Sequence, residues 1–132
     1  MKHSPLLGTV LLLAVGACSD AAAPADDAVF KVDVGGETFH VSVTDAAVIA
    51  EAERRMRDGG GVGIVIGTLA HGDGGFNQPW SWHLVPATVE VVDFSIELCD
   101  GRPSMVEADL EYWVDTVKQF CPWEGKLTAR TQ

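Results

Sequence analysis

The sequence predicts an α+β domain, in which two helices pack on a mostly antiparallel sheet and one disulfide bond links the chain. Short runs of alternating apolar and polar residues, bounded by glycine or proline, predict the strands. Two longer stretches repeat apolar residues at helical spacing and predict the helices. A pair of cysteines in the carboxyl-terminal part predicts the disulfide bond.

The domain begins with a predicted β-hairpin and a helix. Residues 28–34 and 37–43 both alternate, and a Gly-Gly pair between them predicts the turn. Thr44 or Asp45 can cap a helix over about residues 46–57. The apolar stripe of this helix consists of Val48, Ile49, Ala52 and Met56.

The middle of the domain contains three further predicted strands. Residues 62–69 form an apolar run typical of a buried strand, residues 80–85 alternate up to Pro86, and residues 89–98 alternate again. We expect the more apolar face of the last strand to point into the core, and this face consists of Glu90, Val92, Phe94, Ile96 and Leu98. Residues 126–131 predict a closing edge strand.

The second helix is predicted from Ser104 to about Phe120. Ser104 and Glu107 have the spacing of a capping box, in which the serine hydroxyl accepts from a helical amide and the glutamate bonds back. This gives Glu107 a structural role. The buried stripe of the helix is expected to be Val106, Leu110, Trp113, Val114 and Val117.

The amino terminus predicts export and lipidation. Residues 1–17 combine a basic start with an apolar run that is too short to span a bilayer, which is typical of a signal peptide. The sequence Val-Gly-Ala-Cys that ends at Cys18 resembles a bacterial lipobox, in which the cysteine is lipidated and becomes the new amino terminus. We expect a protein that is anchored to the bacterial cell envelope, outside the cytoplasm, through lipid on Cys18. The alternative is an ordinary secretory signal with an incidental Cys18.

Residues 18–27 are small and acidic and predict a flexible linker, so that residues 28–132 form a single domain. The chain has nine Lys+Arg against nineteen Asp+Glu, and removal of residues 1–17 takes away one lysine and no acid. The remaining eight bases and nineteen acids give a formal net charge of −11. A basic footprint for nucleic acid is therefore missing, and no nucleic-acid partner is expected.

Cys99 and Cys121 are the cysteines that remain when Cys18 is lipidated. In an oxidising, exported compartment such a pair is expected to form a disulfide bond. The alternative is a metal-binding or thiol role, which no CxxC spacing supports.

Polar and aromatic residues gather around the predicted central strands. We expect a ligand-binding pocket with an aromatic wall, made of Asn77, Trp80, Trp82, His83, Glu97, Asp100 and Trp123. One alternative is that His83 and Asn77 make buried hydrogen bonds that fix strand register. Another is a small hydrolase or lyase in which His83 works with Glu97 or Asp100 as an acid–base pair. The sequence contains no serine elbow and no HExxH motif, so we favour a non-catalytic role without a cofactor.

A metal-binding domain is a further alternative. Asp73 and Asn77 lie among glycines in a way that is similar to a calcium loop, but their spacing departs from that of an EF-hand. A glycine turn with an asparagine cap explains the same residues. His71, Asp73 and His83 form a second candidate set of metal ligands.

Three motifs resemble a family of small secreted bacterial domains that is similar to the amino-terminal domain of a eukaryotic calmodulin-binding protein. The motifs are Asn77-x-Pro79-Trp80-Ser81-Trp82-His83-Leu84-x-Pro86, Ile96-Glu97-x-Cys99-Asp100-Gly101-x-Pro103 and Cys121-Pro122-Trp123. The resemblance covers about residue 29 to the end of the chain. It implies the disulfide bond and a common fold around residues 80–100, and no activity.

Calmodulin binding does not follow from this resemblance. A calmodulin ligand presents a basic amphipathic helix. The helix after Ser104 carries Lys118 as its only base and four acids, Glu107, Asp109, Glu111 and Asp115. We therefore expect a lipid-anchored binding or interaction module with a small-molecule or protein ligand, and a purely structural envelope protein is the remaining alternative.

Overall fold

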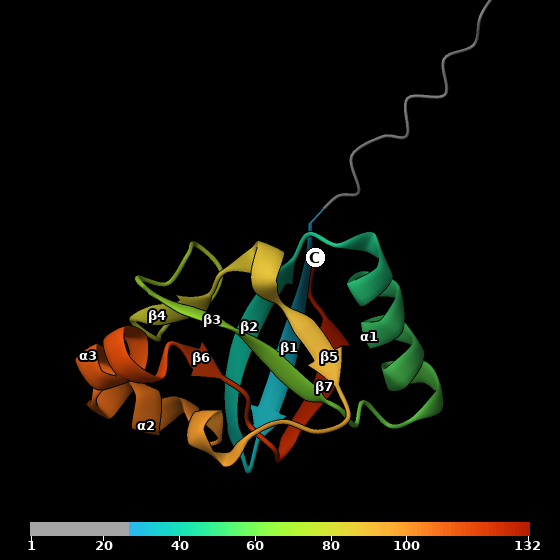
Figure 1. Ribbon diagram of the computed structural model, residues 1–132. Helices are drawn as coiled ribbons and strands as arrows, with labels where there is room; N and C mark the ends of the chain where they lie inside the picture. The colour runs from blue at the N-terminus through green and yellow to red at the C-terminus, as the bar shows by residue number, and fades with distance from the viewer. Residues whose placement is uncertain (1–26) are drawn as a thin grey trace, which may run out of the picture.

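The computed structural model describes residues 27–132. The predicted signal peptide, Cys18 and nearly all of the linker lie outside the described residues. Figure 1 shows strands crossing at the centre, with helix α1 on one side and helices α2 and α3 on the other. Every paired strand runs antiparallel to its neighbour, so the predicted α+β class with antiparallel pairing is confirmed. Within residues 27–132, no helix has the length and apolarity to cross a membrane.

The elements follow a simple order along the chain. The strands are β1 (Ala28–Val34), β2 (Glu37–Val43), β3 (Ile64–His71), β4 (Trp82–Leu84), β5 (Glu90–Val92), β6 (Gln119–Phe120) and β7 (Gly125–Arg130). The helices are α1 (Ala46–Asp58), α2 (Pro103–Ala108) and α3 (Leu110–Tyr112). Short 3-10 turns lie at Pro86–Thr88 and Glu97–Cys99, and a π-helical turn, Trp113–Val117, continues α3.

The strands divide into two sheets, whereas the sequence predicted one. In the first sheet β1 lies between β2 and β7, which confirms the predicted hairpin and the closing edge strand. In the second sheet β3 pairs with β5, then β6, then β4 along its length. The sheets meet where Val62 pairs with Lys126 and the Leu127 amide donates to the Gly61 carbonyl at 2.9 Å. Gly61 has a φ of +78°, and a Cβ at this position would collide with Leu127, so the junction requires glycine.

Helix α1 starts as predicted. The Asp45 carboxylate accepts from the amides of Ala47 at 2.8 Å and Val48 at 3.1 Å, which are otherwise unpaired at a helix start. Ile49 and Ala52 are buried on the predicted stripe. The helix packs against β5 and β7 and so covers the side where the two sheets meet.

An aromatic cluster fills the space between the sheets. Phe39 of β2 lies 5.5 Å from Trp82 of β4 and 5.4 Å from Phe120 of β6 between ring centroids, and the Trp82 and Phe120 rings are 5.3 Å apart. All three side chains are fully buried. Tilted and edge-on contacts at these distances are favourable for aromatic rings, so this cluster joins the two sheets.

The predicted strand over residues 89–98 is wrong beyond Val92. Strand β5 ends there because its partner β3 begins at Ile64, which pairs with Val92, and the preceding Val62 pairs with β7 instead. The chain then turns away and forms the 3-10 turn at Glu97–Cys99. The predicted core face is exposed instead, with solvent-exposed fractions of 86% for Phe94, 61% for Ile96 and 60% for Leu98.

The predicted helix over residues 104–120 is shorter and is interrupted. Helix α2 begins with Pro103, whose missing amide suits the first turn. Lys118 has a φ of +68° and ends the π-helical turn, so that β6 can return to β3. The predicted stripe is confirmed, because Val106, Trp113 and Val117 are buried.

The capping box is wrong, because both of its side chains have partners elsewhere. The Ser104 amide and hydroxyl donate to the Glu37 carboxylate at 2.9 and 2.8 Å. The Glu107 carboxylate accepts from the Ser81 amide at 2.9 Å. Hydrogen bonds to Ser104 lower the pKa of Glu37 below its usual range. A carboxylate from β2 therefore caps α2 in place of a local side chain.

Candidate functional site

The seven residues predicted to line a pocket fall into two groups. Asn77, Trp80, Trp82 and His83 lie in and before β4, whereas Glu97, Asp100 and Trp123 lie around the disulfide bond. In Figure 1, β4 and the orange turn at Glu97–Cys99 are at separate ends of the left-hand side. Within residues 27–132, no hydrogen bond or ion pair joins His83 to Glu97 or to Asp100.

The first group turns its polar atoms inward. Asn77 is fully buried, its Oδ1 accepts from the His40 amide at 2.7 Å, and its Nδ2 donates to the Trp82 carbonyl at 2.7 Å. Trp80 Nε1 donates to the Thr38 carbonyl at 2.8 Å. These bonds join β2 to β4 and to the loop before it, so the polar atoms of Asn77 already have protein partners.

His83 closes the loop before β4. Its Nδ1 donates to the Gly72 carbonyl at 2.7 Å, and the Phe76 ring lies edge-on at 5.7 Å between centroids. A Cβ on Gly74 would lie 2.9 Å from the imidazole, so this loop fits tightly around the ring. His83 therefore helps to hold the loop, with one nitrogen committed to backbone.

The structure does not bring His71, Asp73 and His83 together as metal ligands. The Asp73 carboxylate accepts from the Gly75 amide at 2.8 Å, and this bond lowers the pKa of Asp73. In the described part of the chain, the group of potential ligands that contains His71 contains neither Asp73 nor His83. Asp73 is instead the polar residue of a glycine turn.

The second group is built on the disulfide bond. Cys99 and Cys121 are bonded with a Cα–Cα distance of 5.1 Å, which confirms the predicted pair. The Asp100 carboxylate accepts from the Trp123 amide at 2.8 Å, beside the bond. Glu97 is exposed, and Trp123 has 42% of its surface exposed.

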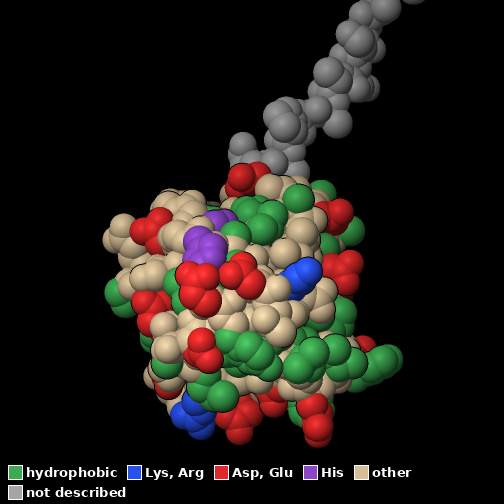
Figure 2. Space-filling model, turned by 60° about the vertical axis from the view of Figure 1, so that its left-hand side comes forward, with side chains coloured by type: hydrophobic (Ala, Val, Ile, Leu, Met, Phe, Trp, Pro, Cys, Tyr) green, Lys and Arg blue, Asp and Glu red, His purple; other side chains and the backbone are tan. Residues whose placement is uncertain are grey.

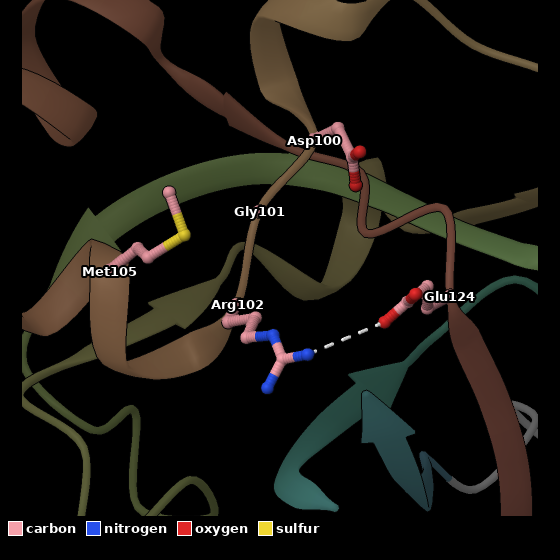
Figure 3. A pocket seen from close by; sticks show the side chains of 5 residues that line it. All are labelled: Asp100, Gly101, Arg102, Met105 and Glu124. Carbon is pink, nitrogen blue, oxygen red and sulfur yellow. Dashed lines mark ion pairs between the residues drawn. The ribbon is translucent and has the colours of Figure 1, made fainter. Parts of the chain in front are cut away.

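Asp100 lines a pocket of about 330 Å³, shown in Figure 3. The other lining residues are Gly101, Arg102, Met105 and Glu124. Arg102 points toward Glu124, and the closest nitrogen–oxygen distance between them is 3.8 Å. Sequence reasoning missed Arg102 and Glu124, because they come from two turns that only the disulfide bond brings close.

An exposed apolar ridge lies next to this pocket. We use "apolar ridge" for Phe94, Ile96, Leu98 and Trp123, whose exposed fractions run from 42% to 86%. Phe94 and Trp123 line one small pocket of about 180 Å³ together with Ile64, Asp93 and Ser95. Figure 2 shows hydrophobic side chains gathered in a band across the lower part of the face that it draws.

Both ends of the segment that carries the ridge are tied down. At its start, Asp93 pairs with Arg55 of α1 at 2.9 Å, and the Arg55 side chain is only 13% exposed. At its end, Cys99 is held by the disulfide bond, and the Cys121 amide donates to the Cys99 carbonyl at 2.8 Å. The apolar side chains are therefore displayed on a segment with restrained ends.

Comparison with known families decides the kinship of the chain. The model of the family described as BP-74 N-terminal domain matches residues 26–132. The chain belongs to this family. The resemblance in the Trp-Ser-Trp-His, Cys-Asp-Gly and Cys-Pro-Trp segments is thereby confirmed at the level of the BP-74 N-terminal domain. No curated protein and no solved structure matches the chain.

Proposed function

We propose that this protein is a lipid-anchored, extracytoplasmic interaction module that binds a protein partner through the apolar ridge and does not catalyse a reaction. The observation that carries the proposal is the exposure of Phe94, Ile96 and Leu98, at 60% to 86%, on a segment with restrained ends. Large contiguous apolar patches on a protein surface commonly mark interaction sites. Lipid on Cys18, as the lipobox predicts, would keep the module at the cell envelope.

The energetics favour binding at the ridge. Full burial of one Phe, Leu or Ile side chain contributes roughly 1.5–3 kcal/mol. The restrained segment also lowers the conformational entropy that binding must remove. A partner with an apolar groove could therefore gain useful affinity from the ridge alone.

The charge around the ridge favours a basic partner. Residues 93–101 contain Asp93, Glu97 and Asp100 and no Lys or Arg. Within the described residues, Asp93 is paired with Arg55, whereas Glu97 and Asp100 have no ion pair. Complementary charge at the rim of an interface favours the correct partner and speeds encounter. We therefore expect an apolar groove bordered by Lys or Arg on the partner.

A second copy of the chain is less favourable as the occupant. A two-fold symmetric contact would place the same surface on both sides, so that Glu97 and Asp100 would meet carboxylates. The whole chain already has a formal net charge of −10. Like charges that face one another across an interface oppose association.

The experiment uses photocrosslinking in cells that export the full chain. A photoreactive amino acid replaces Phe94 in one variant and Tyr112, which is 45% exposed and outside the ridge, in a control. We expect one envelope protein to crosslink at position 94 and not at position 112. In the same cells, Cys18→Ser should move the protein out of the membrane fraction.

The captured protein is then purified and titrated with the full chain. We expect Phe94→Ser to raise the dissociation constant at least tenfold, Tyr112→Ser to leave it unchanged, and added salt to weaken binding. Equal affinity of the Phe94→Ser variant overturns the proposal. Crosslinking of one copy to another contradicts the basic partner, and a Cys18→Ser chain that stays in the membrane fraction contradicts the lipid anchor.

A further inference from the structure

Three side chains with metal-binding donors converge at the end of β3. They are His71, the last residue of β3, Glu111 of α3, and Asp115 of the π-helical turn. One donor atom from each, an imidazole nitrogen or a carboxylate oxygen, lies within 4.8 Å of the other two. Figure 2, which turns the α2–α3 side toward the viewer, shows histidine side chains directly beside carboxylate side chains.

The backbone fixes this arrangement. Glu111 and Asp115 are four residues apart on one helical segment, so their side chains lie on the same face. The Leu69 amide donates to the Lys118 carbonyl at 2.9 Å, which holds the end of that segment against β3. His71 itself is held by pairing with Trp82 of β4. The three donors therefore come from two elements that are joined by main-chain hydrogen bonds.

The charges of the cluster are not compensated by neighbouring side chains. Within residues 27–132, neither Glu111 nor Asp115 takes part in an ion pair. Two nearby carboxylates repel one another, and a bound cation would remove this repulsion. The imidazole separates this group from a simple acidic patch, because His71 comes from a different element and adds a nitrogen donor.

We propose that His71, Glu111 and Asp115 form a binding site for a divalent transition-metal ion, with Zn²⁺ as the best fit. One imidazole and two carboxylates are typical zinc ligands, and three protein ligands leave a position for water. Imidazole also suits Ni²⁺, Cu²⁺ and Fe²⁺. Calcium fits poorly, because it takes six to eight oxygen ligands and does not favour nitrogen.

The site lies outside the apolar ridge and is independent of the proposed partner. Its three side chains are exposed, so the metal would keep water ligands and exchange with solvent. A bound ion would link the end of β3 to the α3 segment, in addition to the Leu69–Lys118 bond. Because a metal that binds only the folded state stabilises it, thermal unfolding reports on binding.

The test is metal titration of the full chain after treatment with a chelator. We expect calorimetry to give one Zn²⁺ per chain, Co²⁺ to produce visible absorption, and Zn²⁺ but not Ca²⁺ to raise the melting temperature. Glu111→Gln and His71→Asn should each weaken Zn²⁺ binding at least tenfold. Asp109→Asn is the matched control, since Asp109 is an exposed acid next to the cluster and outside it.

The exposed positions keep the variants interpretable. Removal of an exposed side chain rarely unfolds a protein, and near-ultraviolet circular dichroism checks the fold of each variant. Zn²⁺ binding that is unchanged in both Glu111→Gln and His71→Asn places the ion on other residues and overturns the proposal. Absence of saturable Zn²⁺ binding up to millimolar concentration also overturns it.

Discussion

In the loop before β4, Asn77 and Trp80 give their polar side-chain atoms to backbone groups of the protein, whereas after β5 Phe94 and Ile96 expose apolar side chains to solvent. The first region has the richer set of unusual residues, with a buried amide, two tryptophans and a histidine. The second region has the larger unsatisfied surface. A binding site needs groups that remain available, so the second region is the better candidate for recognition.

The contrast also separates two kinds of hydrogen-bonding residue. Asn77 has no exposed surface, so its bonds are shielded from water and their loss would leave buried groups unpaired. Glu97 is exposed and free to meet a partner. The type of residue predicts where chemistry is conceivable, and only burial and bonding show whether its atoms are available.

The largest expected effect comes from Asn77→Ala. The change leaves the His40 amide and the Trp82 carbonyl without the bonds that they make to this side chain. Each buried group left unpaired costs about 1–3 kcal/mol, so the free energy of unfolding should fall by roughly 2–5 kcal/mol. Urea unfolding measures the loss. Gln119→Ala removes an exposed amide and is the control, for which a change within ~0.5 kcal/mol is expected.

A small effect of Asn77→Ala would break the comparison. If the free energy of unfolding fell no further than in Gln119→Ala, the Asn77 amide would not be structural. Its two polar atoms could then serve a ligand, as the sequence suggested. The region around β4 would become the stronger candidate for binding.

Features with short-range signals were predictable from the sequence. The hairpin around Gly35-Gly36 needs positive φ angles of 59° and 93°, which glycine adopts readily, and the flanking alternation is local. Asp45 caps the residues that follow it directly. The pairing of Cys99 with Cys121 followed from a count of cysteines in an exported protein.

Features that depend on distant partners were not predictable. Alternation over residues 89–98 shows that a strand could form, but not that β3 would end its pairing at Val92. Ser104 and Glu107 satisfy the spacing of a capping box, yet Glu37, which is 67 residues from Ser104 along the chain, takes the hydroxyl and the amide. Local rules lose here because a charged acceptor makes a stronger bond than a neutral one.

The metal cluster lies between these cases. Glu111 and Asp115 have a helical spacing that the sequence displays openly. Their approach to His71 depends on the pairing of β6 with β3, for which a two-residue strand gives almost no signal. Half of this site could have been found from the sequence, and the other half required the tertiary structure.

The second effect concerns the disulfide bond that holds the apolar ridge. Replacement of both Cys99 and Cys121 by serine opens a link between residues 22 apart, and chain entropy predicts a loss of about 3 kcal/mol. The effect should be uneven, because the bond fixes one end of the segment after β5. Amide hydrogen exchange should accelerate most in residues 93–99 and least in β4. Equal acceleration in both regions would show that the bond stabilises the whole domain and does not specifically restrain the ridge.

The smallest effect concerns Glu37, which caps α2, the helix that lies with α3 on the same side of the molecule. Hydrogen bonds from Ser104 lower the pKa of Glu37 below its usual value of 4.5. A lowered pKa in the folded state means that the ionised carboxylate stabilises the fold above pH 4.5, and that this contribution is lost as the pH falls through the lowered pKa. Glu37→Gln should therefore cost about 1 kcal/mol at neutral pH, because the contact is partly exposed and screened.

The pH dependence decides what Glu37 contributes. Urea unfolding of wild type and Glu37→Gln at neutral and acidic pH should show a difference that shrinks as the wild-type carboxylate becomes protonated. A difference that stays constant across this range would mean that the shape of the hydrogen bonds matters and the charge does not. In that case a neutral amide would cap α2 as poorly at low pH as at high pH, and the attachment of α2 to β2 would be indifferent to acid.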